Sequence, residues 1–155
     1  QNIVIGGAAG ALPPVIGWTI ATNSLSLEPI TFFLIIFFWT PSHFWALSLY
    51  KSDDYKKANI PMLPLTNGVE STKINILVYS LLMLPIIVFP YIISFVGLIF
   101  LIPALLLTFY YNFLCFELYK FKKNRFSSKK AKTIFGYSIL YLFLIFVIFL
   151  IDKIL

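Results

Sequence analysis

The chain has 155 residues, of which 60% are hydrophobic and 12% are charged. Seventeen Phe, nine Tyr and three Trp leave too little polar surface to enclose a soluble globule of this length. The net charge of +6 comes from basic residues between apolar runs, a placement typical of membrane topology and not of nucleic-acid binding. The single Cys115 excludes an internal disulfide and a cysteine-rich metal site.

Apolar runs of roughly 20 residues recur along the chain, and each can cross about 30 Å of hydrocarbon as a helix. We therefore predict an all-α fold, a polytopic membrane helix bundle in which residues 1–155 form a single transmembrane domain. The five predicted spans are Ile3–Thr22, Ile30–Tyr50, Ile74–Phe95, Val96–Tyr119 and Ile134–Ile151. The third and fourth divide one uncharged stretch, so we expect a tight turn near Ser94–Gly97.

The start of the chain also carries a prediction. Its first residue is Gln1 instead of Met, and no signal-peptide pattern precedes the first span. We interpret the chain as a fragment that begins inside a longer protein, and we expect residues 1–155 alone to be inactive.

The orientation follows from the charged loops. Eleven of the twelve Lys and Arg residues lie in the segments after the second and fourth spans, which an alternating topology places on one side: Lys51, Lys56, Lys57, Lys73, Lys120, Lys122, Lys123, Arg125, Lys129, Lys130 and Lys132. Positive charge marks the cytoplasmic face. The C-terminus is then predicted on the opposite side, as is the loop at residues 23–29.

Polar residues gather toward the end of the second span. If its helix continues one turn beyond the membrane, one sector of about 80° faces the bundle interior and opens toward the cytoplasm. That sector contains Trp39, His43, Ala46, Leu47, Tyr50 and Asp54. An ionisable residue inside a membrane span is a functional candidate.

Simpler interpretations of these residues stay open. His43 could bond the Phe37 carbonyl that Pro41 leaves without a partner. Tyr50 could belong to the interfacial aromatic belt. Asp53 and Asp54 could be solvated charges at a helix end, with Lys57 paired to Asp53.

The composition of this cluster favours a magnesium–diphosphate site. Asp53 and Asp54 are hard oxygen ligands for Mg²⁺, and Lys51, Lys56 and Lys57 can neutralise the remaining phosphate charge. Adjacent aspartates project about 100° apart on a helix, so one would bind the metal while the other anchors the loop. A metal at this position would absorb charge as a carbon–oxygen bond breaks.

Two further segments have alternative interpretations. Gly6 and Gly10 match the spacing for close helix contact, which we favour over space left for a bulky ligand. The segment at residues 58–68 could close the mouth of the cavity as a lid or lie against the headgroups. Cys115 is interpreted as a small apolar filler.

Two long words carry a resemblance to a known family. They are NIVIGGAAGALPPVIGW, at residues 2–18, and FFWTPSHFWALSLYKSDDYKKANIPMLPLTNG, at residues 37–68. Both resemble the UbiA-type membrane prenyltransferases, in the branch that farnesylates haem. Two departures stand out: Tyr50 replaces the first acid of an Asp-x-x-x-Asp pattern, and Ser42 replaces the second proline of Thr-Pro-Pro-His.

The resemblance implies a nine-helix bundle around a membrane cavity, of which these spans would be the last five. It implies farnesyl transfer from farnesyl diphosphate to a vinyl group of haem B, with Mg²⁺ as cofactor and haem A synthase or a terminal oxidase downstream. Asp53, Asp54 and Lys51 would be the catalytic residues, with the two acids as metal ligands. His43, Tyr50 and Lys57 would bind substrate.

The implied location is a bacterial or mitochondrial inner membrane, with lipid around the bundle and no nucleic-acid partner. The alternatives are a prenyltransferase that acts on a quinone precursor and a transporter or channel with a polar helix face. The two enzyme readings differ in acceptor, whereas a transporter predicts flux without farnesyl transfer.

Overall fold

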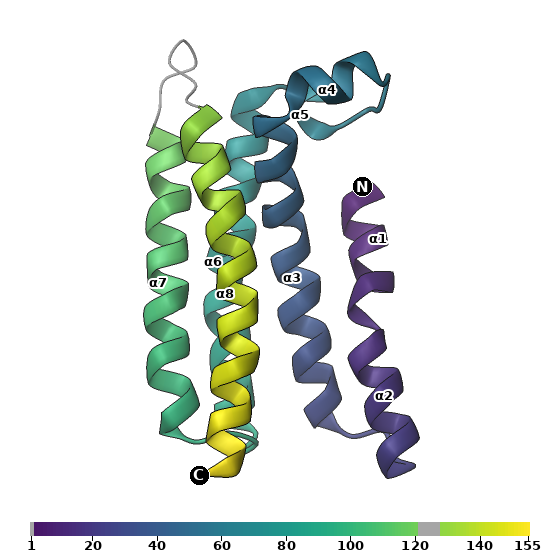
Figure 1. Cartoon of the computed structure of the whole chain (residues 1–155), viewed down its shortest axis with the longest axis vertical. Helices are drawn as coiled ribbons and strands as arrows, with labels where there is room; N and C mark the ends of the chain where they lie inside the picture. The colour runs from purple at the N-terminus through teal and green to yellow at the C-terminus, as the bar shows by residue number, and fades with distance from the viewer. Residues whose placement is uncertain (1, 121–127) are drawn as a thin grey trace.

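The computed structural model describes residues 2–120 and 128–155, and every regular element in these ranges is a helix (Figure 1). The predicted all-α fold class is thereby confirmed. The helices are α1 (Asn2–Ala11), α2 (Pro13–Thr22), α3 (Leu27–Tyr50), α4 (Ser52–Lys57), α5 (Leu63–Thr66), α6 (Val69–Ile92), α7 (Leu98–Lys120) and α8 (Ser128–Ile154).

Within residues 2–120 and 128–155, five segments are long and apolar enough to cross a membrane: Ile3–Thr22, Leu27–Tyr50, Val69–Ile92, Leu98–Lys120 and Ser128–Ile154. The first consists of α1 and α2, which are separated at Leu12 because Pro13 and Pro14 follow it. The third and fifth of these segments, which are α6 and α8, begin more than one turn before the spans that we predicted. Hydropathy marks the apolar part of a helix, whereas backbone hydrogen bonds continue into the charged interface.

The predicted turn between the third and fourth spans lies at residues 93–97, between α6 and α7. Ser94 adopts a left-handed conformation with φ 57°. Across the bundle, Asp152 near the end of α8 accepts hydrogen bonds from the backbone N–H groups of Gly97, at 2.9 and 3.1 Å, and Phe100, at 3.0 Å. The adjacent Lys153 ammonium donates to the Phe95 carbonyl. Asp152 therefore caps the start of α7 from 55 residues away.

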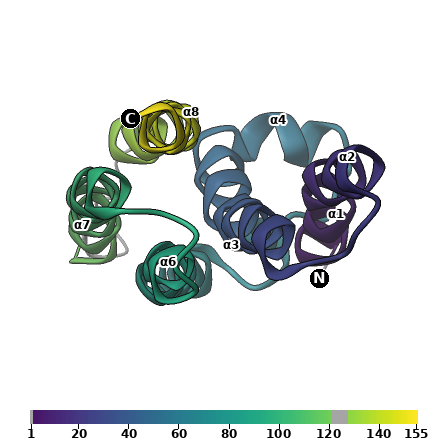
Figure 2. The same cartoon turned by 90° about the horizontal axis from the view of Figure 1, so that it is seen from below.

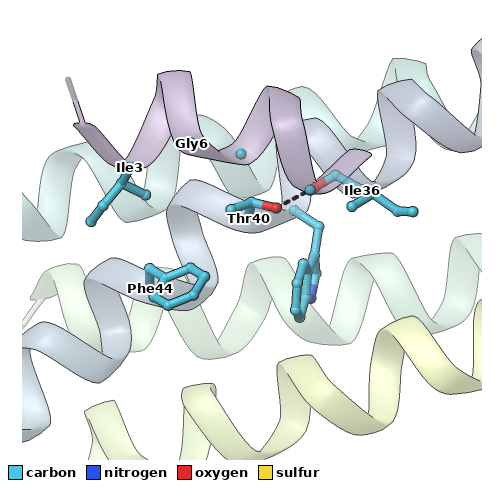
Figure 3. A pocket seen from close by; sticks show the side chains of 8 residues that line it. Ile3, Gly6, Ile36, Thr40 and Phe44 are labelled. Atoms are coloured by element: carbon cyan, nitrogen blue, oxygen red, sulfur yellow. Dashed lines mark hydrogen bonds between the residues drawn. The ribbon is translucent and has the colours of Figure 1, made fainter. Parts of the chain in front are cut away.

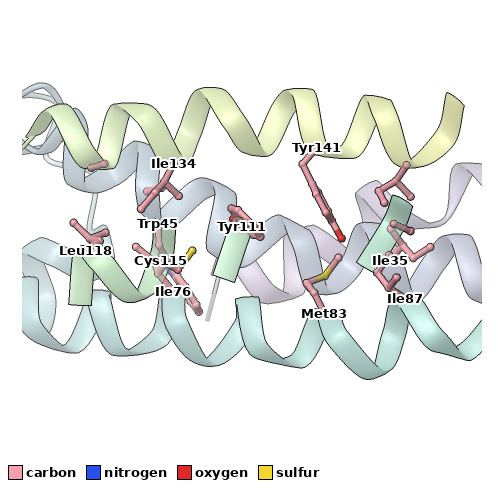
Figure 4. Packing of buried hydrophobic residues seen from close by; sticks show 14 of the residues in the cluster. Ile35, Trp45, Ile76, Met83, Ile87, Tyr111, Cys115, Leu118, Ile134 and Tyr141 are labelled. Atoms are coloured by element: carbon pink, nitrogen blue, oxygen red, sulfur yellow. The ribbon is translucent and has the colours of Figure 1, made fainter. Parts of the chain in front are cut away.

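In the bundle, α3, α6, α7 and α8 pack together, and α1 and α2 lie on the other side of α3 (Figure 2). The short helix α4 crosses one end of the bundle between α3 and α1 (Figures 1 and 2). Side chains from α3, α6, α7 and α8 meet in a continuous core (Figure 4). Cys115 is fully buried there, as an apolar filler would be.

Interhelical hydrogen bonds cross this apolar core. The Tyr111 hydroxyl donates to Ser42 Oγ at 2.8 Å, and the Thr108 and Tyr141 hydroxyls lie 3.0 Å apart. The Tyr137 hydroxyl donates to the Leu107 carbonyl at 2.9 Å. Because apolar side chains gain little by leaving lipid for another helix, directional bonds of this kind help to select one register.

The cap at Asp152 gives a first prediction. Asp152→Ala is expected to lower the free energy of unfolding by about 1 kcal/mol, since the first turn of α7 loses its acceptor. Thermal unfolding of the detergent-solubilised protein, followed by circular dichroism, measures the change. Asp53→Ala, which removes an exposed carboxylate, is the matched control. Equal melting temperatures for the two variants would contradict the cap.

Candidate functional site

The helix at the acidic pair is interrupted, which corrects one prediction. Helix α3 ends at Tyr50, Lys51 has φ −107° and ψ 25°, and α4 begins at Ser52. The polar sector that we expected on one continuous helix therefore stops at Tyr50. Asp54 belongs to a separate helix that turns across the end of the bundle (Figure 1). Because of this break, Asp53 and Asp54 lie on α4 at the end of the bundle and do not continue the line of α3.

The break creates a small pocket at this end of α3. Its volume is about 220 Å³, and it is lined by Tyr50, Lys51, Asp53 and Asp54. The Lys51 ammonium lies 3.1 Å from Asp54 Oδ2. This hydrogen bond and the charge of Asp54 raise the pKa of Lys51 above its ordinary value. The pocket thus places two carboxylates, a permanent cation and a phenol ring together, as the candidate site requires.

Lys51 pairs with Asp54, and the pair between Asp53 and Lys57 that we left open as an alternative does not occur within residues 2–120 and 128–155. Lys57 is exposed in the last turn of α4 and does not line the pocket. The structure therefore brings four of the predicted site residues together and leaves Lys57 at the rim. Its role in substrate binding stays a prediction.

The donor set of the pocket suits a hard cation. Asp53 and Asp54 supply carboxylate oxygens, and Mg²⁺ is commonly held by one or two carboxylates together with substrate phosphates. No cluster of three or more His, Cys, Asp or Glu side chains occurs in residues 2–120 and 128–155. These ranges thus offer ligands for a metal shared with a phosphate, and not an all-protein cage.

His43 lies deeper, between α3 and α8. Its ring is buried and stacks on Trp39, with centroids 4.2 Å apart, and on Phe135, with centroids 4.7 Å apart. His43 Nδ1 lies 2.6 Å from Ser138 Oγ, and Trp39 Nε1 donates to the Ser138 carbonyl at 2.8 Å. The interaction seen is thus with α8, and not with the Phe37 carbonyl on its own helix. His43 does not line the acidic pocket, and its proposed substrate role stays a prediction.

The glycines of α1 were partly misassigned. A Cβ atom at Gly7 would lie 3.1 Å from Thr40 Cγ2, whereas Gly6 and Gly10 have no neighbour within 4 Å of that position. The close helix contact therefore occurs at Gly7. Gly6 and Gly10 instead line an apolar groove of about 500 Å³ between α1 and α3 (Figure 3). The groove is compatible with the alternative that these glycines leave room for a bulky ligand, which stays a prediction.

The segment at residues 58–68 packs against the bundle. Its helix α5 contacts α3 and α6, and Pro64 is buried. A cavity of about 320 Å³ that reaches Trp45 and Ile3 is also bordered by six residues of the segment: Ile60, Pro61, Met62, Leu63, Thr66 and Asn67. The segment therefore covers part of the acidic end of the bundle, and its predicted closing motion stays a prediction.

The sequence analysis did not single out one basic residue, Lys132, that lies near the candidate site. Lys132, in the second turn of α8, places its ammonium 5.6 Å from the centroid of the Tyr50 ring, and Lys51 lies 5.5 Å from the same centroid. In the sequence Lys132 is one member of a long basic run. Only the packing of α8 on α3 distinguishes it from its neighbours.

Residues 1–145 match the model of the UbiA prenyltransferase family. This chain belongs to that family. It is 89% identical over its whole length to a Pelagibacter ubique protein named protoheme IX farnesyltransferase, of which it covers 51%. It is 48% identical, also over its whole length, to a Parvibaculum lavamentivorans protein of the same name, of which it covers 49%.

A Nitrobacter winogradskyi protein named protoheme IX farnesyltransferase 2 is 45% identical over 98% of the chain, which covers 49% of it. The chain thus spans about half the length of the curated relatives that it matches. No solved structure matches it. The five apolar helices and the family together make this an integral membrane protein.

The contact between His43 and Ser138 gives a second prediction. A double-mutant cycle with His43→Phe, which keeps an aromatic ring, and Ser138→Ala is expected to show about 1 kcal/mol of coupling in the free energy of unfolding. Ser80→Ala is the control, because Ser80 Oγ donates to Leu77 on its own helix. Coupling of His43 to Ser138 no greater than to Ser80 would contradict the contact.

Proposed function

We propose that this chain supplies five helices and one diphosphate-binding end to a protohaem IX farnesyltransferase. The observation that carries the proposal is the pocket of Tyr50, Lys51, Asp53 and Asp54 at the end of a membrane helix. The names of relatives up to 89% identical support haem as the acceptor. Membership of a prenyltransferase family favours an enzyme over a transporter or channel.

The proposed reaction transfers farnesyl from farnesyl diphosphate to a vinyl group of haem B. The carbon–oxygen bond breaks and its electron pair leaves with the diphosphate. The vinyl π electrons form the new carbon–carbon bond, and the cation left on the other vinyl carbon takes up water and releases a proton to give haem O. The chain's task is to bind the leaving group and to keep the cation from premature contact with water.

Asp53 and Asp54 would hold Mg²⁺ together with the diphosphate oxygens. When bound, the metal supplies charge neutralisation of the leaving group. Lys51 pairs with Asp54 at 3.1 Å, and it would be able to contact a phosphate oxygen if Asp54 held the metal. His43 and Tyr50 are proposed to orient the acceptor.

The groove between α1 and α3 suits the apolar part of the donor. It is lined by Thr40, Trp39, Phe44 and the glycines of α1, and it offers few polar atoms. Thr40 precedes Tyr50 by ten residues, or about 15 Å along the helix, which is comparable to an extended farnesyl chain. A diphosphate in the acidic pocket could thus extend its chain toward the groove.

The acidic pair gives a third prediction. The variants are made in a hybrid protein in which this chain replaces the matching part of the 89% identical Pelagibacter relative. Asp53→Asn combined with Asp54→Asn is expected to lower farnesyl transfer at least about 100-fold, because diphosphate departure loses its metal ligands. Product formation with farnesyl diphosphate, Mg²⁺ and haem B is measured by chromatography.

Glu117→Gln is the matched control, since it removes a carboxylate that pairs with Lys130 away from the pocket. Normal transfer by the double variant would refute the proposed role of the acidic pair. A quinone-type aromatic acceptor is tested in parallel. Farnesylation of that compound in place of haem B would reassign the acceptor while it left the diphosphate site in place. The inactivity of residues 1–155 alone is tested in the same assay.

The proposed orientation in a bacterial or mitochondrial inner membrane, with the basic loops on the cytoplasmic or matrix side, gives a fourth prediction. Asn67→Cys at the acidic end and Ser24→Cys at the opposite end are both exposed positions, and the native Cys115 is buried. In bacterial spheroplasts a membrane-impermeant maleimide is expected to label Ser24→Cys only. Labelling of Asn67→Cys in intact spheroplasts would contradict this orientation.

A further inference from the structure

We propose that Lys132 of α8 is a further diphosphate-binding residue, whose ammonium contacts oxygens of the leaving group beside Tyr50. The inference rests on the proposed function and extends its site to a helix that sequence reasoning left out. It starts from one contact: Lys132 Nζ lies 5.6 Å from the Tyr50 ring centroid, and Tyr50 lines the acidic pocket.

The register of α3 and α8 places Lys132 beside Tyr50, which is one of the residues that line the pocket. The two helices run in opposite directions (Figure 1). From the bond between His43 and Ser138, Tyr50 lies seven residues onward along α3 and Lys132 six residues back along α8. At 1.5 Å per residue both are displaced by about 10 Å toward the same end of the bundle. A buried hydrogen bond at 2.6 Å therefore positions the lysine.

The charges at the pocket leave Lys132 available. Lys51 is compensated by Asp54 at 3.1 Å, whereas Lys132 forms no ion pair with any residue in the ranges 2–120 and 128–155. Both ammonium groups lie near one phenol ring, whose π face attracts cations. Two cations near one ring repel each other, and a polyanion that binds both offsets this repulsion.

Nearby lysines of α8 lack these features. The Lys130 ammonium lies 2.7 Å from Glu117 Oε2 on α7. Lys129 and Lys132 are both exposed, but of these two only Lys132 places its ammonium near the Tyr50 ring. Lys132 is thus distinguished by its contact with a residue of the pocket. The geometry favours an anion that Lys51 and Lys132 share across Tyr50, and a diphosphate bound to a metal at Asp53 and Asp54 has the charge and the number of oxygens for both.

The test compares Lys132→Gln with Lys129→Gln in the hybrid protein, because both remove one positive charge from the first turns of the same helix. The probe is inorganic pyrophosphate with Mg²⁺, and its affinity is measured by calorimetry in detergent. K132Q is expected to weaken binding about 10-fold and K129Q less than 2-fold, whereas K132R keeps most of the affinity. Matching melting temperatures of K132Q and K129Q show that folding is intact.

Kinetics supply the second readout. K132Q is expected to raise the KM for farnesyl diphosphate about 10-fold and to leave the KM for haem B unchanged. Equal pyrophosphate affinities of K132Q and K129Q would overturn the role of Lys132, even if haem farnesylation proceeds. A K132Q-specific loss of pyrophosphate affinity without any haem product would support Lys132 and refute the proposed acceptor. Absence of pyrophosphate binding by the unmodified hybrid would overturn both.

Discussion

The packing of α8 on α3 is the constraint on which the candidate site depends. In lipid, apolar helices gain little free energy from one partner or register over another. Polar contacts across the interface therefore help to select the register. Ser138 receives two of them, from His43 at its hydroxyl and from Trp39 at its carbonyl. A shift of α8 by one residue would separate these groups and move Lys132 away from Tyr50. The register of α8 on α3 therefore also decides which charged side chains meet at the end of the bundle.

The fold was largely predictable because the length of each apolar run and the charge of each loop are properties of consecutive residues. Five spans and the turn near Ser94 follow from apolar runs that need about 20 residues each. The acidic pair and Lys51 were predictable for the same reason, as neighbours in sequence. The break at Lys51 was not predictable, because the sequence there contains no residue that prevents a helix from continuing. The capping role of Asp152 depends on a residue 55 positions away, which no local pattern contains.

The partner of His43 shows the same limit in a different way. Its own helix offers a candidate, the carbonyl left by Pro41, and local reasoning stops there. In the structure the ring turns to Ser138 on α8 and stacks between Trp39 and Phe135. A buried imidazole needs both a hydrogen-bond partner and neighbours against which its ring can pack. For His43 the hydrogen-bond partner lies on another helix, so only the tertiary structure identifies it. The glycines of α1 follow this rule as well, since Gly7 contacts α3 while Gly6 leaves a groove.

The basic residues that orient the chain also explain why one of them can take part in chemistry. A membrane protein collects lysines on its cytoplasmic side whatever its activity, and a diphosphate site on that side then has cations within reach. What separates the two roles is the local partner. Lys130 is bound to Glu117, Lys51 is held by Asp54, and Lys132 lies over a ring of the pocket with no carboxylate of the described residues beside it. The charge of Lys132 is thus less compensated than the charges of Lys51 and Lys130, so a lysine that helps to orient the chain would also be able to bind an anion in the pocket.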